Sequence, residues 1–224
     1  LMPAQEGSIA STTLYLRLTG EAEGSFSGNL VHSSAGATSI SFPVSGEVSH
    51  PSSGYATDLF FSEYVEGTNS RKALEIFNGT GEAIDLTAYS IKKQTNGGGV
   101  WGSELILSGT LPDNDVYVIA YGNGTQEGYI IESYVDLYTT SGAMSFNGDD
   151  ALRLYHSGVA IDQIGIENQL ANWGADMTLV RNPEISSPSL AYQLSDWQSY
   201  PSDTLQYLGS HNFNNNPPAI STPT

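Results

Sequence analysis

Residues 58–81, DLFFSEYVEGTNSRKALEIFNGTG, constrain the fold of this chain more than any other segment. The first half carries β-prone apolar and aromatic residues, and a second such run begins at Lys72. The four residues at 67–70, Gly-Thr-Asn-Ser, separate the two runs as a turn. The segment therefore predicts two adjacent antiparallel strands.

Side-chain alternation along these strands predicts which residues face the core. Leu59, Phe61, Leu74 and Ile76 are expected to point inward. The carboxylates, which by residue type could be acids or ligands, are expected to point outward; they are Glu63, Glu66 and Glu75. The segment thus favours a scaffold over a reactive centre.

Short strand-like runs with dense turn signals continue along the chain. Strands are predicted at residues 58–64, 72–77, 88–94, 104–108, 115–121, 143–147, 150–155, 159–165 and 177–181. Asn147-Gly148 predicts a two-residue hairpin between the strands that flank it, and Ser157-Gly158 predicts another. One short helix is expected near residues 126–134. This pattern favours an all-β, antiparallel β-sandwich.

Acidic residues far outnumber basic ones. The chain has 24 Asp and Glu against 7 Lys and Arg, a formal charge of −17. This charge repels nucleic-acid backbones and anionic membrane surfaces, so neither is expected as a partner. We interpret the acidity as a means of solubility, with an acidic surface that collects Ca²⁺ as the alternative.

Two further properties of the sequence exclude whole classes of site. The absence of cysteine excludes disulfides, thiol catalysis and cysteine-ligated zinc. No apolar run is long enough to span a bilayer.

Residues 1–50 hold three strand-like runs ahead of a turn-rich linker at 51–56. The runs STTLYLRL, GSFSGN and VSGEV resemble the C-terminal half of an immunoglobulin-like repeat of secreted Bacteroidetes proteins. Three strands are too few for a self-sufficient sandwich. This partial module is expected to pack on the main domain, on another copy as a homodimer, or on nothing.

Three blocks in residues 57–214 resemble the bacterial lamin tail domain. The first joins FSEYVEG to KALEIFNGTGEAIDL at 61–86. The second joins LSGTLPDNDVYVIAYG at 107–122 to FNGDDALRLYHSGVAIDQIG at 146–165. The third joins MTLVRNPEI at 177–185 to DWQSYPSDTLQYLGSH at 196–211. A flexible tail is expected at 215–224.

The resemblance implies an immunoglobulin-like fold and an extracellular or cell-surface location in a bacterium. Bacterial relatives are often attached to nucleases and phosphatases, and the module itself carries no catalytic residues that transfer to this chain. Fold resemblance alone does not establish function.

Residue types that could carry chemistry are read as structural. The histidines are His32, His50, His156 and His211, and none stands in a nucleophile motif. For His211 we expect a hydrogen bond that closes the last strand. Asp149 is expected to brace the Asn-Gly turn through backbone bonds, and Asp113 to cap the start of a strand. Asp150 and Asp115 complete these acidic pairs, for which Ca²⁺ is the alternative.

Basic and aromatic residues offer further alternatives. Lys92-Lys93 and Arg71-Lys72 could form a nucleic-acid patch, although pairing with carboxylates is favoured. Trp101 could stack on a sugar from an exposed loop, whereas Trp173 and Trp197 are read as core residues. The glycosylation sequons at Asn78 and Asn123 and the Asp-Thr-Leu motif at Thr204 are read as coincidental or weak.

The sequence therefore predicts a non-catalytic binding, anchoring or spacer module, with no catalytic, cofactor-binding or metal residues and no cofactor. The first alternative is an accessory domain of an extracellular nuclease or phosphatase whose catalytic domain lies outside this chain. The second is a carbohydrate- or calcium-binding module. The expected partner is an unknown protein or a surface glycan.

Overall fold

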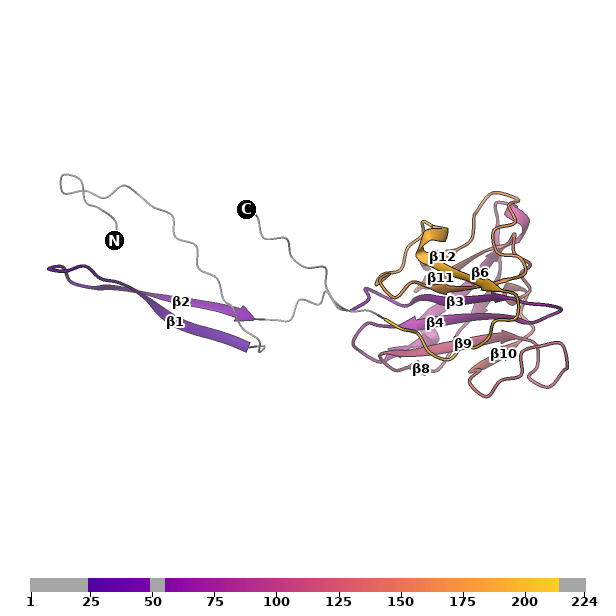
Figure 1. Ribbon diagram of the computed structural model, residues 1–224, viewed down its shortest axis with the longest axis horizontal. Helices are drawn as coiled ribbons and strands as arrows, with labels where there is room; N and C mark the ends of the chain where they lie inside the picture. The colour runs from indigo at the N-terminus through magenta and orange to yellow at the C-terminus, as the bar shows by residue number, and fades with distance from the viewer. Residues whose placement is uncertain (1–23, 49–54, 214–224) are drawn as a thin grey trace. The chain divides into compact units, whose positions relative to one another are not determined.

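The computed structural model describes residues 24–48 and 55–213 (Figure 1). The chain divides into two compact units, the N-terminal unit Leu1–Ser52 and the main unit Ser53–Thr224. The strand predicted around Leu16, His50, most of the 51–56 linker and the 215–224 tail lie outside the described residues.

In its described residues 24–48 the N-terminal unit forms an antiparallel hairpin of β1 (Gly24–His32) and β2 (Ile40–Val48), two of the strands that the sequence predicted. Leu30 lies opposite Phe42, so these two side chains share a face. The same face includes Ile40, and the side chains of Ile40 and Phe42 are 55% and 54% exposed. A two-stranded hairpin with an exposed apolar face has little stability by itself.

The main unit is a β-sandwich built from a six-stranded and a four-stranded sheet. The larger sheet has the order β10-β9-β4-β3-β13-β14, antiparallel except for the β10–β9 pair. Its strands are β3 (Phe60–Glu66), β4 (Lys72–Asn78), β9 (Asp115–Tyr121), β10 (Leu137–Thr139), β13 (Met177–Arg181) and β14 (Trp197–Pro201).

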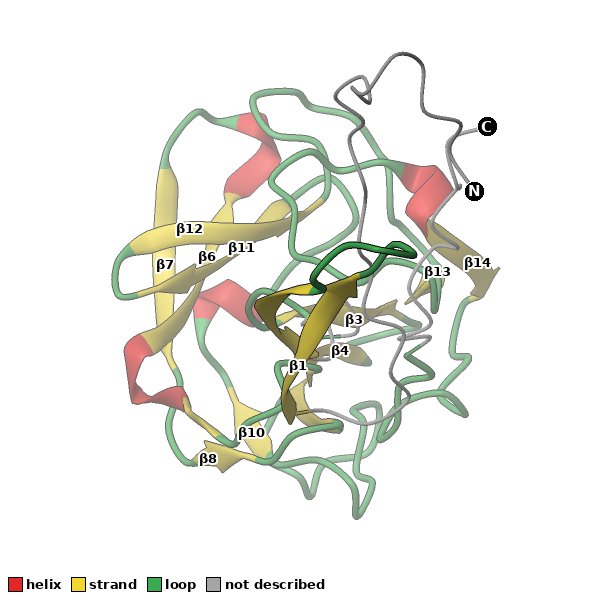
Figure 2. Cartoon of the chain, turned by 90° about the vertical axis from the view of Figure 1, so that its left-hand side faces the viewer, coloured by secondary structure: helices red, strands yellow, loops and turns green. Residues whose placement is uncertain are grey.

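The smaller sheet has the order β12-β11-β6-β7 and forms the second layer (Figure 2). Its strands are β6 (Tyr89–Gln94), β7 (Trp101–Ile106), β11 (Ala151–His156) and β12 (Val159–Ile164). A short pair, β5 (Ile84–Asp85) and β8 (Thr110–Leu111), forms a separate two-stranded sheet that packs on the core through Ile84 and Leu111. The 3-10 turns are η1 (Leu86–Ala88), η2 (Thr95–Gly97), η3 (Gly142–Met144) and η4 (Leu194–Asp196).

These two layers confirm the predicted immunoglobulin-like, all-β sandwich. Within the described ranges no helix is long and apolar enough to cross a membrane. The inner faces of the two sheets enclose one large core, which includes the predicted inward residues Leu59, Phe61, Leu74 and Ile76.

The six-stranded sheet is also buried on its outer face. Phe60, Val65, Phe77 and Val118 form a second apolar cluster there. Its cover comes from the segment between β9 and β10, through Ile130, and from residues 204–213, which we call the C-terminal strap. The strap supplies Leu205, Leu208 and Phe213.

This second cluster overturns the predicted exposure of the carboxylates of β3 and β4. Glu63 and Glu75 do point away from the inner core, but each is only 1% exposed because the outer face is covered. Glu66 is buried as well and pairs with Lys72. Alternation correctly placed Glu75 of the regular strand β4 on the outer face, and the irregularity between Phe61 and Glu63 turns Glu63 to the same face. The cover over both, contributed by segments remote in sequence, was not predicted.

Two predicted elements are absent from the fold. Residues 143–147 form η3 and a loop rather than a strand, so Asn147-Gly148 is not a hairpin turn. Met144 and Phe146 insert into the core from that loop, and apolar alternation alone does not distinguish such an insertion from a strand. Residues 126–134 form turns instead of the expected helix.

Other elements follow the sequence closely or shift by a few residues. The Ser157-Gly158 hairpin is confirmed, with φ of 50° and 79° at its two central residues, as a type I′ turn requires. The strand predicted at 104–108 begins earlier, at Trp101. Four short strands were not predicted: β5, β8, β10 and β14.

A buried ion pair joins the two sheets at the start of β3. Arg181 of β13 donates from Nη1 to Asp162 Oδ2 of β12 at 2.8 Å, and both side chains are almost fully buried. Asp162 Oδ2 also accepts from the Phe61 amide, and Asp162 Oδ1 accepts from the Ser189 amide. The Arg181 guanidinium lies over the rings of Phe60 and Trp197.

Removal of one partner of this pair is expected to destabilise the fold strongly. Arg181→Met leaves the Asp162 carboxylate buried without its cation, which costs about 3–5 kcal/mol of unfolding free energy. The matched control is Lys92→Met, which breaks the more exposed Lys92–Glu104 pair and should cost less than about 1 kcal/mol. Urea unfolding of both variants measures the difference, and equal losses would contradict this assignment.

Candidate functional site

An aspartate, a histidine and a tyrosine meet where the chain enters β3. Asp58 Oδ2 lies 2.8 Å from His156 Nδ1, and Asp58 Oδ1 accepts from the Tyr89 hydroxyl at 2.6 Å. The imidazole stacks on the Tyr89 ring, with the two ring centroids 4.3 Å apart. An aspartate that orients a histidine is also the supporting half of a hydrolase triad.

The surroundings of His156 favour a structural role for this group. Among the described residues, the only hydrogen bond of the imidazole is to Asp58, and no hydroxyl nucleophile binds it. Ser157, its neighbour, instead uses its backbone amide to bond the carbonyl of Ala88. Asp58 thereby ties the start of β3 to β6 and β11.

Glu63 and Glu75 form a buried pair of ionisable side chains in the main unit. They lie directly opposite each other in the β3–β4 ladder, just after a bulge at Ser62. Glu75 accepts from the Ser62 hydroxyl and from the Gly209 amide of the strap, each at 2.7 Å. Neither carboxyl oxygen of Glu63 has a hydrogen-bond partner.

Burial shifts the protonation of this pair towards the neutral form. The pKa of Glu63 is raised to about 9, first by burial and then by the charge of Glu75 opposite. Burial also raises the pKa of Glu75 to about 7, against the opposing effect of its hydrogen bonds from Ser62 and Gly209. At neutral pH the pair therefore holds at least one proton.

His211, also on the covered outer face, does not make the predicted hydrogen bond. Its ring packs edge-on against Phe60 and Phe77, and its Nε2 has no partner. Burial lowers the pKa of His211 to about 4, with a further contribution from Arg181. The imidazole is therefore neutral near pH 7 and offers no counter-charge to the glutamates.

Every lysine and arginine of the main unit is paired with a carboxylate. The chain has seven such residues, and Arg17 lies outside the described residues. The six pairs are Arg71–Asp203, Lys72–Glu66, Lys92–Glu104, Lys93–Asp150, Arg153–Glu167 and Arg181–Asp162. The four cations considered as a nucleic-acid patch are thus all engaged within the fold.

The acidic pairs singled out from the sequence also serve as supports. Asp150 is buried, pairs with Lys93 and accepts from the Asn96 amide. With the Asn147 amide in the orientation that satisfies its neighbours, its nitrogen donates to Asp149 Oδ1, so Asp149 does not brace a turn backbone. Asp113 accepts from the amide of Gly81 in another loop, so it does not cap its own strand.

No metal centre emerges from these carboxylates. Across residues 24–48 and 55–213, no three His, Asp or Glu side chains come together as a metal site would require.

The tryptophans and sequons occupy structural positions. Trp173 and Trp197 are buried, as predicted, while Trp101 begins β7 instead of standing on a loop. The Arg153 guanidinium covers the Trp101 ring at 4.2 Å. Asn78 is fully buried and its amide bonds three backbone carbonyls, whereas Asn123 is exposed. Thr204 is half-buried and donates to the carbonyl of Pro201.

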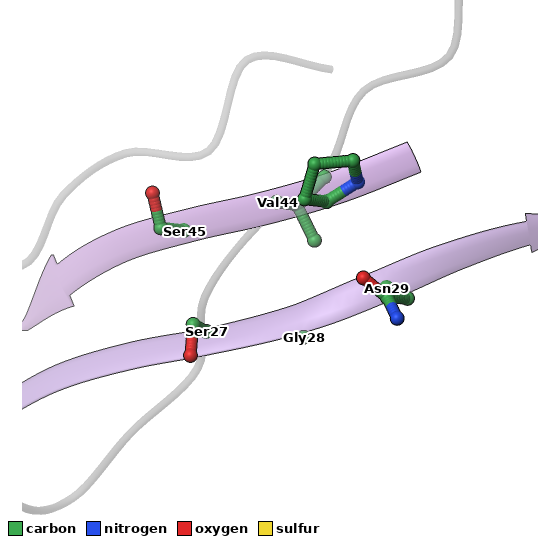
Figure 3. Close-up of a pocket in the computed structure, with 6 residues that line it drawn as sticks. Ser27, Gly28, Asn29, Val44 and Ser45 are labelled. Carbon is green, nitrogen blue, oxygen red and sulfur yellow. The ribbon is translucent and has the colours of Figure 1, made fainter. Parts of the chain in front are cut away.

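The hairpin of the N-terminal unit carries an open depression between its strands (Figure 3). It is lined by Ser27, Gly28, Asn29, Pro43, Val44 and Ser45. None of these side chains is charged, and the labelled polar groups do not converge on one point. His32 lies further along β1 and is exposed.

The raised pKa values of the two glutamates predict an alkaline loss of stability. The folded state holds their protons more tightly than the unfolded chain, where the ordinary pKa is 4.5, so the unfolding free energy falls as pH rises towards about 9. Between pH 7 and 9 the Glu63 proton accounts for about 2–3 kcal/mol. His211 has the opposite sign, but it titrates only below its ordinary pKa of 6.5.

Urea unfolding at pH 7, 8 and 9 measures this slope. Glu63→Gln, which cannot ionise, is expected to flatten it, while Glu82→Gln at an exposed position should retain it. A Glu63→Gln variant that loses stability as steeply as the parent chain would refute the assignment.

Comparison with known proteins agrees with this architecture. Residues 52–168, more than half of the chain, match the Lamin Tail Domain family. No curated protein and no solved structure matches the chain. The match ends before β13 and β14, which complete the six-stranded sheet. The chain therefore belongs to the lamin tail domain family.

Proposed function

We propose that this chain is a non-catalytic module that binds, anchors or spaces its neighbours in a secreted or cell-surface bacterial protein. The observation that carries the proposal is that the lysines, arginines and buried acids of the main unit make structural contacts. All six cations of the main unit and its buried acids Asp150 and Asp162 hold loops and sheets together. The family match to an immunoglobulin-like domain supports the same view.

Any catalytic domain associated with this module then lies outside the chain. An extracellular nuclease or phosphatase is the parent that the resemblance suggests. In such a parent the lamin tail unit would act as an accessory domain, since its own side chains are engaged in packing and ion pairs.

The hairpin of the N-terminal unit is the surface that we propose for docking to a second copy of the chain. One face, here called the apolar face, holds Leu30, Ile40, Phe42 and Val44 together with His32. The other face is mostly polar and holds Ser27, Asn29, Ser41 and Ser45 together with Val31 and Pro43. Exposed apolar side chains gathered on one face of a sheet mark an interaction surface.

Activity measurements test the absence of catalysis. The purified chain is expected to hydrolyse phosphodiester, phosphomonoester and glycoside substrates no faster than its His156→Gln variant, which removes the Asp58–His156 contact. A turnover that one substitution abolishes would make the chain an enzyme and overturn the proposal.

Sedimentation tests the docking surface separately. The parent chain is expected to form a dimer at micromolar concentration, and Phe42→Ser should make it a monomer because it removes an apolar contact. Val31→Ser is the matched control, since Val31 is 58% exposed but lies on the polar face. A monomeric parent chain, or a dimer that survives Phe42→Ser, would rule out this surface.

A further inference from the structure

The Glu63–Glu75 pair lacks a counter-charge within its own unit. Each of the six lysines and arginines is already bound to a different carboxylate. The strap contributes His211, which is neutral at pH 7. The cations of the main unit therefore leave none to neutralise the pair, and protons suffice because each buried carboxyl needs only one.

The other titratable groups that act on the pair add no positive charge. Tyr134 and Asp136 come from the segment between β9 and β10, and Tyr200 comes from β14. Asp136 is another acid, which adds to the repulsion at Glu75. Loss of the last proton from the pair thus places two like charges in direct cross-strand register.

The strap is the part of the structure best placed to respond. Its central backbone contact to the sheet is the bond from the Gly209 amide to Glu75. At its start the Thr204 carbonyl accepts from Thr178, and at its end Phe213 packs on Phe60 and Phe77. Lifting the strap would admit water to both glutamates without disturbing the core between the sheets.

We propose that the Glu63–Glu75 pair is a proton-dependent latch for the C-terminal strap. With a proton on the pair the strap stays docked on β3, β4 and β9. When the last proton leaves, the strap detaches, the two carboxylates become hydrated, and the apolar outer face with Phe60, Val65 and Phe77 is uncovered.

A spin label on the strap measures this release directly. The chain has no cysteine, so Asn212→Cys, at an exposed strap position, gives one labelling site in the full chain. The ratio of mobile to immobile label is expected to rise about tenfold per pH unit between pH 7 and 9, because one proton is lost on release. Tryptophan fluorescence, which reports on buried Trp173 and Trp197, should stay constant over this range.

Two variants in the labelled background make the experiment decisive. Glu63→Gln should keep the label immobile up to pH 9, and Glu184→Gln, at an exposed position, should behave as the parent. A label that stays immobile in the parent, that is released equally in Glu63→Gln, or that is released only as tryptophan fluorescence changes would overturn the latch. Re-docking by millimolar CaCl₂ at pH 9 would also overturn it, because the pair would then be a cation site.

Discussion

The buried carboxylate of Asp162 is the polar contact that joins the two sheets most deeply in the main unit. It belongs to β12 of the smaller sheet, yet its bonds go to Arg181 of β13 and to the Phe61 amide of β3 in the larger sheet. Arg181 in turn donates to the Phe61 carbonyl. The backbone of β3 leaves its regular ladder at this bulge, so the ion pair satisfies polar groups that would otherwise be buried without partners.

The bulge at Ser62 follows from the same arrangement. One extra residue in β3 shifts the alternation, which allows Phe61 and Tyr64 both to face the inner core and turns Glu63 to the outer face. The alternation in the sequence predicted Leu74 and Ile76 in the core, because β4 is regular. It could not predict the environment of Glu63, since the residues that cover it, such as Leu208, lie far along the chain.

Contacts between segments remote in sequence also explain the other differences between the predicted and observed structure. Met144 and Phe146 alternate as they would in a strand, but they plug the core from a loop whose place depends on Lys93 and Asp150. The candidate site also depends on a contact between residues that are remote in sequence. Asp58 and His156 are 98 positions apart and carry no shared motif, so only the pairing of β6 with β11 brings His156 to Tyr89 and Asp58.

The two sheets differ in how their charged and ionisable side chains are paired and exposed to solvent. The strands β3, β4 and β9 of the larger sheet contribute to apolar clusters on both faces, and the buried Glu63 and Glu75 on the outer face have no cation partner. The smaller sheet pairs Lys92 with Glu104 and Arg153 with Glu167, with partly exposed carboxylates in both pairs. Each of these cations also rests on an aromatic ring: Lys92 on Tyr155 and Arg153 on Trp101.

Lys92 and Arg153 gain nothing from leaving their present partners unless a ligand replaces both the carboxylate and the ring. This is a demanding requirement for any anion. A surface of this kind resists adventitious binding. Among the described residues, the apolar face of the β1–β2 hairpin differs from it, because its exposed Ile40 and Phe42 side chains are not covered in this way.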